Sequence, residues 1–419
     1  MVIKMNQKDI EKKTKAYALK NALAYDGKAQ VGSVISSLFH EGLEKKDIGK
    51  YSKIINEIVS KVNKLSKEEQ EKEFEKLKEE TSERKSREGL EELPNVKKSG
   101  VIMRFAPSPS GALHIGHAIT ASLSWDYVMK YGGRFYVRIE DTNSENIYTP
   151  AYKLIEEDAK WLFDNKAKII TQSERMKLYY KYALKLIKKG WAYVCTCSSD
   201  DFREKYANNK KDCPCRNLAP KENEIRWNKM LNPEKNKKDS FNEGDAVLRF
   251  KTSDEDYGMA HPNPAMRDFP LARINLMKHP LQKNKYRVWP LMNLAVTVDD
   301  IEMKMTHIIR AKEHRDNAKR QEMIYKALDK KEEFPWTGFL GRIHLKDMKL
   351  SSTEITQGIK EKKYSGWDDK KLLTVASLKK QGYTPKAFWK LAEHIGLSEN
   401  DKTLSKKEFF ELLDTFNKK

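Results

Sequence analysis

The sequence predicts an α/β protein in which a parallel sheet is built in two parts that are separated by an inserted domain. Three observations support this fold class. Residues 101–139 have the order strand, loop, helix, strand that builds parallel sheets. Strand-like runs resume at residues 246–250 and 295–300, after a cysteine-bearing, lysine-rich stretch. Both ends of the chain are charged and have helical patterns.

Residues 1–98 are expected to form a separate helical appendage. One apolar stripe recurs at helical spacing in Ile54, Ile55, Ile58, Val59 and Val62. The following residues, 64–93, are almost wholly charged with alternating signs, which is typical of a solvated helix or a connector. The break to the next segment falls between Pro94 and Gly100.

Residues 101–139 carry the clearest pattern of elements. VIMRF (101–105) is an apolar run that predicts a strand, and the Pro- and Gly-rich loop APSPSGA follows it. A helix is expected next, with apolar residues at i+4 steps, and Gly132–Gly133 stops it. FYVRI (135–139) alternates as a strand does.

The remaining pattern divides the chain further. We predict the first half of the sheet domain in 99–190, an inserted domain in 191–285, the second half in 286–345 and a mostly helical segment in 346–419. The strand-like runs AVLRF (246–250) and AVTVDD (295–300) support this order. Trp367 and Trp389 are expected to anchor a small core in the last segment.

The amino-acid composition indicates which kinds of partner the protein is expected to bind. Lys and Arg outnumber Asp and Glu by 81 to 61, which gives a net charge of +20. This surplus favours a polyanionic partner, most simply RNA, but a lysine-rich solvated surface would give the same balance. No apolar run approaches the roughly 20 residues that span a bilayer, and the N-terminus has no apolar signal core. We therefore expect a cytoplasmic protein without a membrane partner.

Residues 104–117, RFAPSPSGALHIGH, carry the most specific chemistry. The loop leaves a strand end and enters a helix N-terminus, where backbone N–H groups and the helix dipole favour a phosphate. His114 and His117, three residues apart, lie on one helical face and can donate to phosphate oxygens. Gly116 lets the backbone come close to a flat adenine.

All four cysteines lie in one stretch, as Cys195-Thr-Cys197 and Cys213-Pro-Cys215. Four soft ligands gathered this closely in a cytosolic protein favour one tetrahedral, structural zinc ion over disulfides. Four reduced, partly buried thiols are the alternative.

Together these motifs resemble the archaeal-type glutamyl-tRNA synthetases, class I aminoacyl-tRNA synthetases. RFAPSPSG followed by HIGH matches the glutamyl/glutaminyl branch, and RIED (138–141), NKYRVWP, AVTVDD, THIIRAKEH and KYSGWDD follow in the family's order. KNALAYDGKAQVGSVI resembles the family's helical appendage. The resemblance implies a Rossmann-like catalytic domain interrupted by an acceptor-stem-binding insertion, with zinc there in some members, and a helical stem-contact segment at 346–419.

The resemblance also implies roles for single residues. His114, His117 and Lys349 would act on the phosphates of ATP, which is bound with Mg²⁺. Arg104 and Arg310 would bind the two carboxylates of L-glutamate, and Arg310 would select glutamate over glutamine. Glu140 would accept the substrate ammonium, with Ser108 in the same loop.

Four departures from the family weaken these expectations. Glu354 in KLSSTE stands where the family has the second lysine of its mobile loop, so Lys346 or Lys360 would have to substitute. Met292 stands where a tyrosine helps to hold the amino acid. KKLLT replaces PRLPT after GWDD. The chain ends at Lys419, before the family's β-rich anticodon-binding region.

The end at Lys419 has three explanations: a separate anticodon-binding polypeptide, a trimmed chain, or charging through the acceptor stem and D-arm alone. The leading hypothesis is a glutamate–tRNA ligase that charges tRNA(Glu). The alternatives are a weakly active paralogue that binds tRNA or a partner protein, and an enzyme that aminoacylates a different acceptor.

Overall fold

The computed structural model describes residues 6–81, 89–232, 240–346 and 352–418, and it divides the chain into two compact units, Met1–Arg87 and Glu88–Lys419. None of the helices in these described ranges is long and apolar enough to cross a membrane. The predicted domain boundaries, including the one at residue 98, stay predictions.

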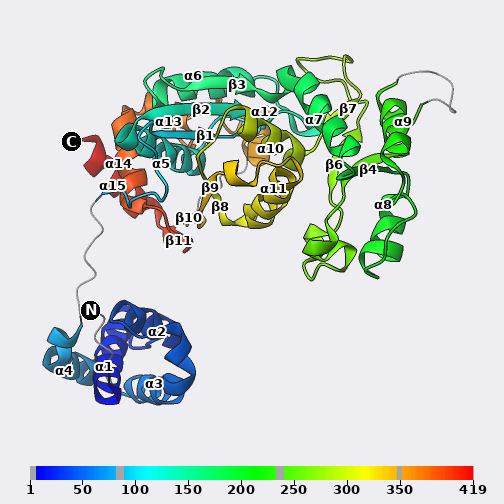
Figure 1. Cartoon of the computed structure of the whole chain (residues 1–419). Helices are drawn as coiled ribbons and strands as arrows, with labels where there is room; N and C mark the ends of the chain where they lie inside the picture. The colour runs from blue at the N-terminus through cyan, green and yellow to red at the C-terminus, as the bar shows by residue number, and fades with distance from the viewer. Residues whose placement is uncertain (1–5, 82–88, 233–239, 347–351, 419) are drawn as a thin grey trace. The chain divides into compact units, whose positions relative to one another are not determined.

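The first unit is a bundle of helices (Figure 1). The predicted stripe is confirmed, because Ile55, Val59 and Val62 of α3 are buried in its core. Within the charged stretch, residues 67–77 form α4, which begins with a capping box between Ser66 and Glu69 and buries only Gln70. The helices are α1 (Gln7–Ala24), α2 (Val31–His40), η1 (Lys45–Asp47), α3 (Ile48–Val62), α4 (Lys67–Leu77) and η2 (Lys78–Glu80).

The second unit contains the parallel sheet. β1 (Val101–Phe105), β2 (Gly133–Ile139) and β3 (Lys168–Thr171) pair in parallel in that order, and β8 (His307–Ala311) pairs in parallel with β9 (Trp336–Leu340). The two sheets meet where the backbone N–H of Thr306 donates to Ile102 O at 3.0 Å. The predicted two-part sheet is therefore confirmed.

Helices α5 (Ile115–Tyr131), α6 (Ala151–Leu162), α13 (Val375–Lys380), α14 (Pro385–Ile395) and α15 (Lys406–Asn417) share one core with β1 and β2. The turn from α5 to β2 requires glycine, because Gly133 has φ +126° and a Cβ there would lie 1.9 Å from Val101 O. Trp389 packs against this same core, whereas Trp367 lies in a small separate cluster. β10 (Ile343–Leu345) pairs in parallel with β11 (Lys402–Leu404), and α12 spans Ser352–Lys360.

The part of the chain between β3 and β8 forms a separate sheet, which is antiparallel. Its strands are β4 (Ala192–Cys195), β5 (Val247–Phe250), β6 (Pro270–Ile274) and β7 (Val288–Pro290). In Figure 1 it lies at the opposite end of the second unit from α14 and α15. Its neighbours are α7 (Met176–Lys188), α8 (Ser199–Asp201), η5 (Phe202–Ala207), α9 (Pro220–Leu231), α10 (Met292–Glu302) and α11 (Arg315–Ala327). Short 3₁₀ turns complete the unit: η3 (Ser144–Asn146), η4 (Gln172–Arg175), η6 (Asp254–Asp256), η7 (Gly258–Ala260), η8 (Pro264–Met266), η9 (Lys312–His314) and η10 (Lys331–Glu333).

One predicted strand is wrong. AVTVDD (295–300) lies within helix α10, not in a strand. Its β-branched residues favoured a strand, but every residue from Asn293 to Ile301 is buried, so the helix lacks the polar face that would reveal its period. The predicted strand 246–250 is confirmed as β5, which begins at Val247.

Candidate active site

The loop between β1 and α5 forms the first part of the candidate active site. β1 ends at Phe105, and α5 begins at Ile115 with His114 as its N-cap residue. Nδ1 of His114 accepts a hydrogen bond from the backbone N–H of Gly116 at 3.1 Å. An anion at this helix end would meet the positive end of the helix dipole, but the backbone N–H groups of Ile115 and Gly116 already donate to Leu373 O and His114 Nδ1.

The rings of His114 and His117 stack with centroids 3.7 Å apart. Burial lowers the pKa of His114 to about 4. Burial, and then the neighbouring His114, lower the pKa of His117 well below its usual value. Both imidazoles are therefore neutral at pH 7, and they can serve a phosphate as N–H donors rather than as cations. Because Nδ1 of His114 is an acceptor, its proton is on Nε2.

Two glycines leave room for rings in this loop. A Cβ at Gly116 would lie 3.1 Å from Cε1 of His114, and a Cβ at Gly111 would lie 2.5 Å from Cη2 of Trp367. The structure thus accounts for a glycine at position 116 by the space that the ring of His114 occupies. The predicted close approach of adenine to Gly116 stays a prediction.

Backbone atoms of Leu373 and Val375, in the C-terminal part of the chain, hydrogen-bond to residues where the loop between β1 and α5 enters α5. Ile115 N–H donates to Leu373 O at 2.9 Å, and Val375 N–H donates to Leu113 O at 2.8 Å. The KKLLT departure is therefore compatible with this contact, which uses backbone atoms. From α6, buried Asp158 accepts from Leu113 N–H at 3.3 Å, and burial raises the pKa of Asp158 to about 7.

Two arginines from β1 and β2 are held by one carboxylate from α10. Arg104 donates from Nε and Nη2 to the two oxygens of Asp300, at 2.9 and 3.1 Å. Arg138 donates to Asp300 Oδ1 at 2.6 Å and to Glu140 at 3.0 Å. Arg104, Arg138 and Asp300 are all buried. This network ties β1 and β2 to helix α10 and orients Glu140.

The neighbouring carboxylate, Asp299, ties α10 to the segment after β3. It accepts from Gln172 Nε2 at 2.9 Å, from Arg175 Nε at 2.6 Å and from Tyr179 Oη at 2.8 Å. Its side chain is fully buried. Arg138 Nε lies 3.7 Å from Asp299, so the two adjacent aspartates share one arginine.

Arg310, on β8, has no carboxylate partner among the described residues. Its Nη1 donates to Oε1 of Gln321 at 2.9 Å, while its Nε is buried without a hydrogen-bond partner. The side chain is only 7% exposed. Burial, and then the charge of Arg104, lower the pKa of Arg310 to about 10.

The buried arginines and carboxylates around Arg104 do not balance in charge. Four guanidinium groups (Arg104, Arg138, Arg175 and Arg310) face three carboxylates (Glu140, Asp299 and Asp300). One positive charge therefore remains, and the uncompensated guanidinium is that of Arg310. A buried charge without a partner is costly, so this position suits an anionic ligand.

The structure brings together most of the predicted site residues. His114, Gly116 and His117 form one group, and Arg104, Glu140 and Arg310 belong to another. Lys349 lies outside the described residues. The sequence analysis missed four residues of the second group, Arg138, Gln321, Asp299 and Asp300. Two adjacent acidic residues in an otherwise apolar run were the available signal for the aspartates, because charges buried there need partners.

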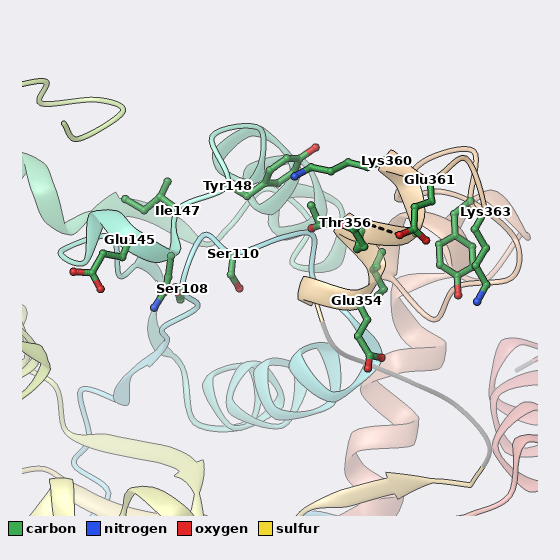
Figure 2. A pocket seen from close by; sticks show the side chains of 15 residues that line it. Ser108, Ser110, Glu145, Ile147, Tyr148, Glu354, Thr356, Lys360, Glu361 and Lys363 are labelled. Carbon is green, nitrogen blue, oxygen red and sulfur yellow. Dashed lines mark hydrogen bonds between the residues drawn. The ribbon is translucent and has the colours of Figure 1, made fainter. Parts of the chain in front are cut away.

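Ser108 lies elsewhere in the same loop, at an open cavity of about 1050 Å³. Figure 2 shows Ser108, Ser110 and Tyr148 on one side of this cavity and Glu354, Thr356 and Lys360 of α12 on the other. The predicted repulsion between Glu354 and phosphates stays a prediction, as does the substitution by Lys360. Met292 is the first residue of α10 and is half-buried.

The four cysteines form a second candidate site, at the end of β4. The sulfur atoms all lie within 4.8 Å of one another, and Sγ of Cys195 is 3.9 Å from Sγ of Cys213. The hydrogen bond from Cys195 lowers the pKa of Cys213. Arg226 and the backbone N–H of Thr196 approach Sγ of Cys215, at 3.6 and 3.5 Å. These contacts favour the thiolate form of Cys213 and Cys215, the form that binds metal. The hydrogen bond with Cys213 raises the pKa of Cys195, and burial raises the pKa of Cys197 to about 11.

Known proteins match this chain over nearly all of its length. The family model described as tRNA synthetases class I (E and Q), catalytic domain, matches residues 100–417. A glutamate–tRNA ligase of Methanosphaera stadtmanae is 40% identical over 412 residues, which cover 96% of this chain and 70% of that protein. The glutamate–tRNA ligase of Pyrococcus furiosus is 41% identical over 408 residues, 95% of this chain and 69% of its own.

A solved structure supports the same fold. The glutamate tRNA ligase of Elizabethkingia meningosepticum, crystallised with its amino acid, aligns with a TM-score of 0.51 at 21% identity, over 76% of this chain and 69% of that one. The match at 100–417 covers both histidines, the arginine–carboxylate network and the cysteines. The sequence resemblance is thus confirmed, and the chain belongs to the class I tRNA synthetases of the E and Q type.

Proposed function

We propose that this protein is a glutamate–tRNA ligase, which activates L-glutamate with ATP and transfers it to the 3′ end of tRNA(Glu). The observation that carries the choice of amino acid is the buried guanidinium of Arg310, which lacks a carboxylate among the described residues. The side-chain carboxylate of glutamate supplies the missing negative charge. A neutral amide in its place would leave that charge unpaired. The relatives bear the same activity in their names.

The geometry suggests how the residues divide the work. Arg104 donates from Nε and Nη2 to both oxygens of Asp300, so its charge is already paired with a carboxylate, although Nη1 and the second N–H of Nη2 remain as donors. Arg310 still has Nε and Nη2, the edge that binds a carboxylate at two points. We therefore assign the side-chain carboxylate of glutamate to Arg310. Glu140, held by Arg138, faces the ammonium group.

In the first step, an oxygen of the substrate α-carboxylate attacks the α-phosphorus of ATP, and pyrophosphate leaves. The N–H groups of His114 and His117 donate to phosphate oxygens, and Lys349 adds a positive charge. The Mg²⁺ that accompanies ATP neutralises phosphate charge. In the second step, a ribose hydroxyl of the terminal tRNA nucleotide attacks the carbonyl carbon of the adenylate, its proton passes to the departing phosphate, and AMP leaves. The protein contributes position and electrostatic stabilisation.

Glutamate-dependent ATP–pyrophosphate exchange tests this function. We expect exchange with L-glutamate and tRNA present, and little exchange with glutamine. The assay is run with and without tRNA, because enzymes of this branch commonly require tRNA for activation. Absence of exchange under both conditions contradicts the proposal. It would favour instead a paralogue that binds tRNA or a partner, for which Glu354, which lines the same cavity as Ser108 and Ser110, is the supporting observation.

We further propose that Cys195, Cys197, Cys213 and Cys215 hold one structural zinc ion. In a tetrahedral site with Zn–S bonds of about 2.3 Å, the sulfurs lie about 3.8 Å apart. The 3.9 Å between Cys195 and Cys213 fits this value, and all four sulfurs are close enough for small adjustments to complete the set. Four cysteine ligands leave no open position for catalysis.

We expect purified protein to contain one zinc ion per chain, measured by elemental analysis. Cys197→Ser removes a half-buried ligand and is expected to lower the zinc content and the thermal unfolding temperature together. Cys195→Ser should do the same, although its buried position in β4 adds a packing cost. Zinc-free protein whose unfolding temperature is unchanged by added zinc or by Cys197→Ser would contradict the proposal.

Two further expectations belong to this proposal. The charging of tRNA for protein synthesis fits a cytoplasmic location. A separate anticodon-binding polypeptide would be the partner that reads tRNA(Glu) beyond its acceptor arm.

A further inference from the structure

Arg310 is held in place by a neutral side chain. Gln321, on α11, accepts from Nη1 of Arg310 at 2.9 Å and is only 3% exposed. The amide of Gln321 is itself oriented from α10, because its Nε2 donates to Oδ1 of Asn293 at 3.4 Å. This chain of contacts fixes one edge of the guanidinium and leaves Nε and Nη2 for another partner.

The neutrality of Gln321 contrasts with the partners of neighbouring buried arginines. Arg104 and Arg138 are both bound by the carboxylate of Asp300. Arg249 and Arg267, which lie elsewhere, donate to backbone carbonyls instead. Glutamate has nearly the shape of glutamine, so a carboxylate at position 321 would fit the same space and would pair with Arg310.

A carboxylate at position 321 would also remove the charge imbalance. The cluster around Arg104 has four guanidinium groups and three carboxylates. A fourth carboxylate would balance it without a ligand, and the substrate carboxylate would then have to enter a site that is already neutral. The neutral amide keeps Arg310 oriented while its charge remains available.

We propose that Gln321 is a positioning residue that sets the preference for glutamate over glutamine, by orienting Arg310 without neutralising it. The inference rests on the proposed function and adds to it a residue that touches Arg310 rather than the substrate. Asn293 extends the same support, since it fixes which end of the amide faces Arg310.

Two variants at one position separate charge from packing. In Gln321→Glu the contact with Arg310 is kept but becomes an ion pair. We expect the KM for glutamate to rise roughly 10- to 100-fold, the range that one charge-assisted bond represents. The KM for ATP should stay within about twofold, because His114 and His117 are untouched. The ratio of kcat/KM for glutamate to that for glutamine should fall.

In Gln321→Met the acceptor is lost but the cluster keeps its positive charge. The KM for glutamate should rise less than in Gln321→Glu, and the preference for glutamate over glutamine should be better preserved. Gln30→Glu, at an exposed position in the first unit, is the matched control for the added charge and should change none of these constants. Exchange is measured in the presence of tRNA, and thermal unfolding is recorded for each variant.

The experiment distinguishes failure of the proposed function from failure of the inference about Gln321. If the unaltered protein shows no glutamate-dependent exchange, the proposed function fails and the inference fails with it. If the unaltered protein is active and Gln321→Glu leaves the KM for glutamate and the amino-acid preference unchanged, only the inference fails. Equal rises in the KM values for glutamate and ATP would also overturn it. If Gln321→Glu does not fold, Gln321→Met decides, because a rise in the KM for glutamate alone is still expected.

Discussion

Replacing Arg310 by glutamine is expected to lower kcat/KM for glutamate by roughly 100- to 1000-fold, because two charge-assisted hydrogen bonds to the substrate carboxylate are lost. The KM for ATP should change little, since Arg310 lies in the arginine–carboxylate cluster and not beside the stacked histidines. The measurement is ATP–pyrophosphate exchange with tRNA, at varied glutamate and at varied ATP. The folded state should tolerate the change, because it removes a buried charge that lacks a carboxylate partner among the described residues.

Arg203→Gln is the matched control. Arg203 is an arginine whose side chain is 63% exposed on η5, and its loss should leave the KM for glutamate unchanged. An Arg310→Gln variant that used glutamate as well as the unaltered protein would contradict the assignment of the substrate carboxylate to Arg310. A variant that lost glutamate and ATP use equally would contradict it too, since that result indicates a general disturbance of the site.

The sequence predicted the parts of the fold whose pattern is local. The strand at 101–105, the helix that follows His114 and its stop at Gly132–Gly133 all have propensity, period and end signals that agree. Helix α10 was mistaken for a strand because it is buried on every side, so its period is hidden. The parallel pairing of β10 with β11 could not be foreseen either, since these strands are three residues each and lie far apart in the chain.

The candidate site also combines residues that are close in the sequence, which could be predicted, with contacts between distant residues, which could not. His114 is the N-cap residue of α5 and His117 lies three residues further on, so their association follows from spacing alone. The pairing of Arg104 with Asp300 joins residues 196 positions apart, and only the meeting of β1 with α10 creates it. Gln321 carries no signal in the sequence, because an isolated glutamine on a helix is most often solvated. Its importance follows from its contact with Arg310, a long-range fact of packing.

Replacing Asp300 by alanine is expected to lower the free energy of unfolding of the second unit by about 3–5 kcal/mol, because the change leaves Arg104 and Arg138 buried without their shared carboxylate. Urea unfolding followed by tryptophan fluorescence measures this. All eight tryptophans lie between Trp125 and Trp389, in the second unit, so the signal reports on that unit alone.

The size of this effect comes from burial, and the control isolates that cause. Asp368 also accepts from a basic residue, Lys380, at 2.7 Å, but the two side chains are 49% and 56% exposed, so Asp368→Ala should cost no more than about 1 kcal/mol. Burial acts to raise the pKa of Asp300, but the charges of Arg104 and Arg138 outweigh it and hold the pKa below the usual 3.8. The stabilisation is therefore present above pH 3.8 and is lost as the pH falls through the lower pKa of the folded state. The difference in stability between the unaltered protein and Asp300→Ala should shrink in that acidic range, and a difference that stayed constant there would show that a lost packing contact, not the ion pairs, destabilises the variant.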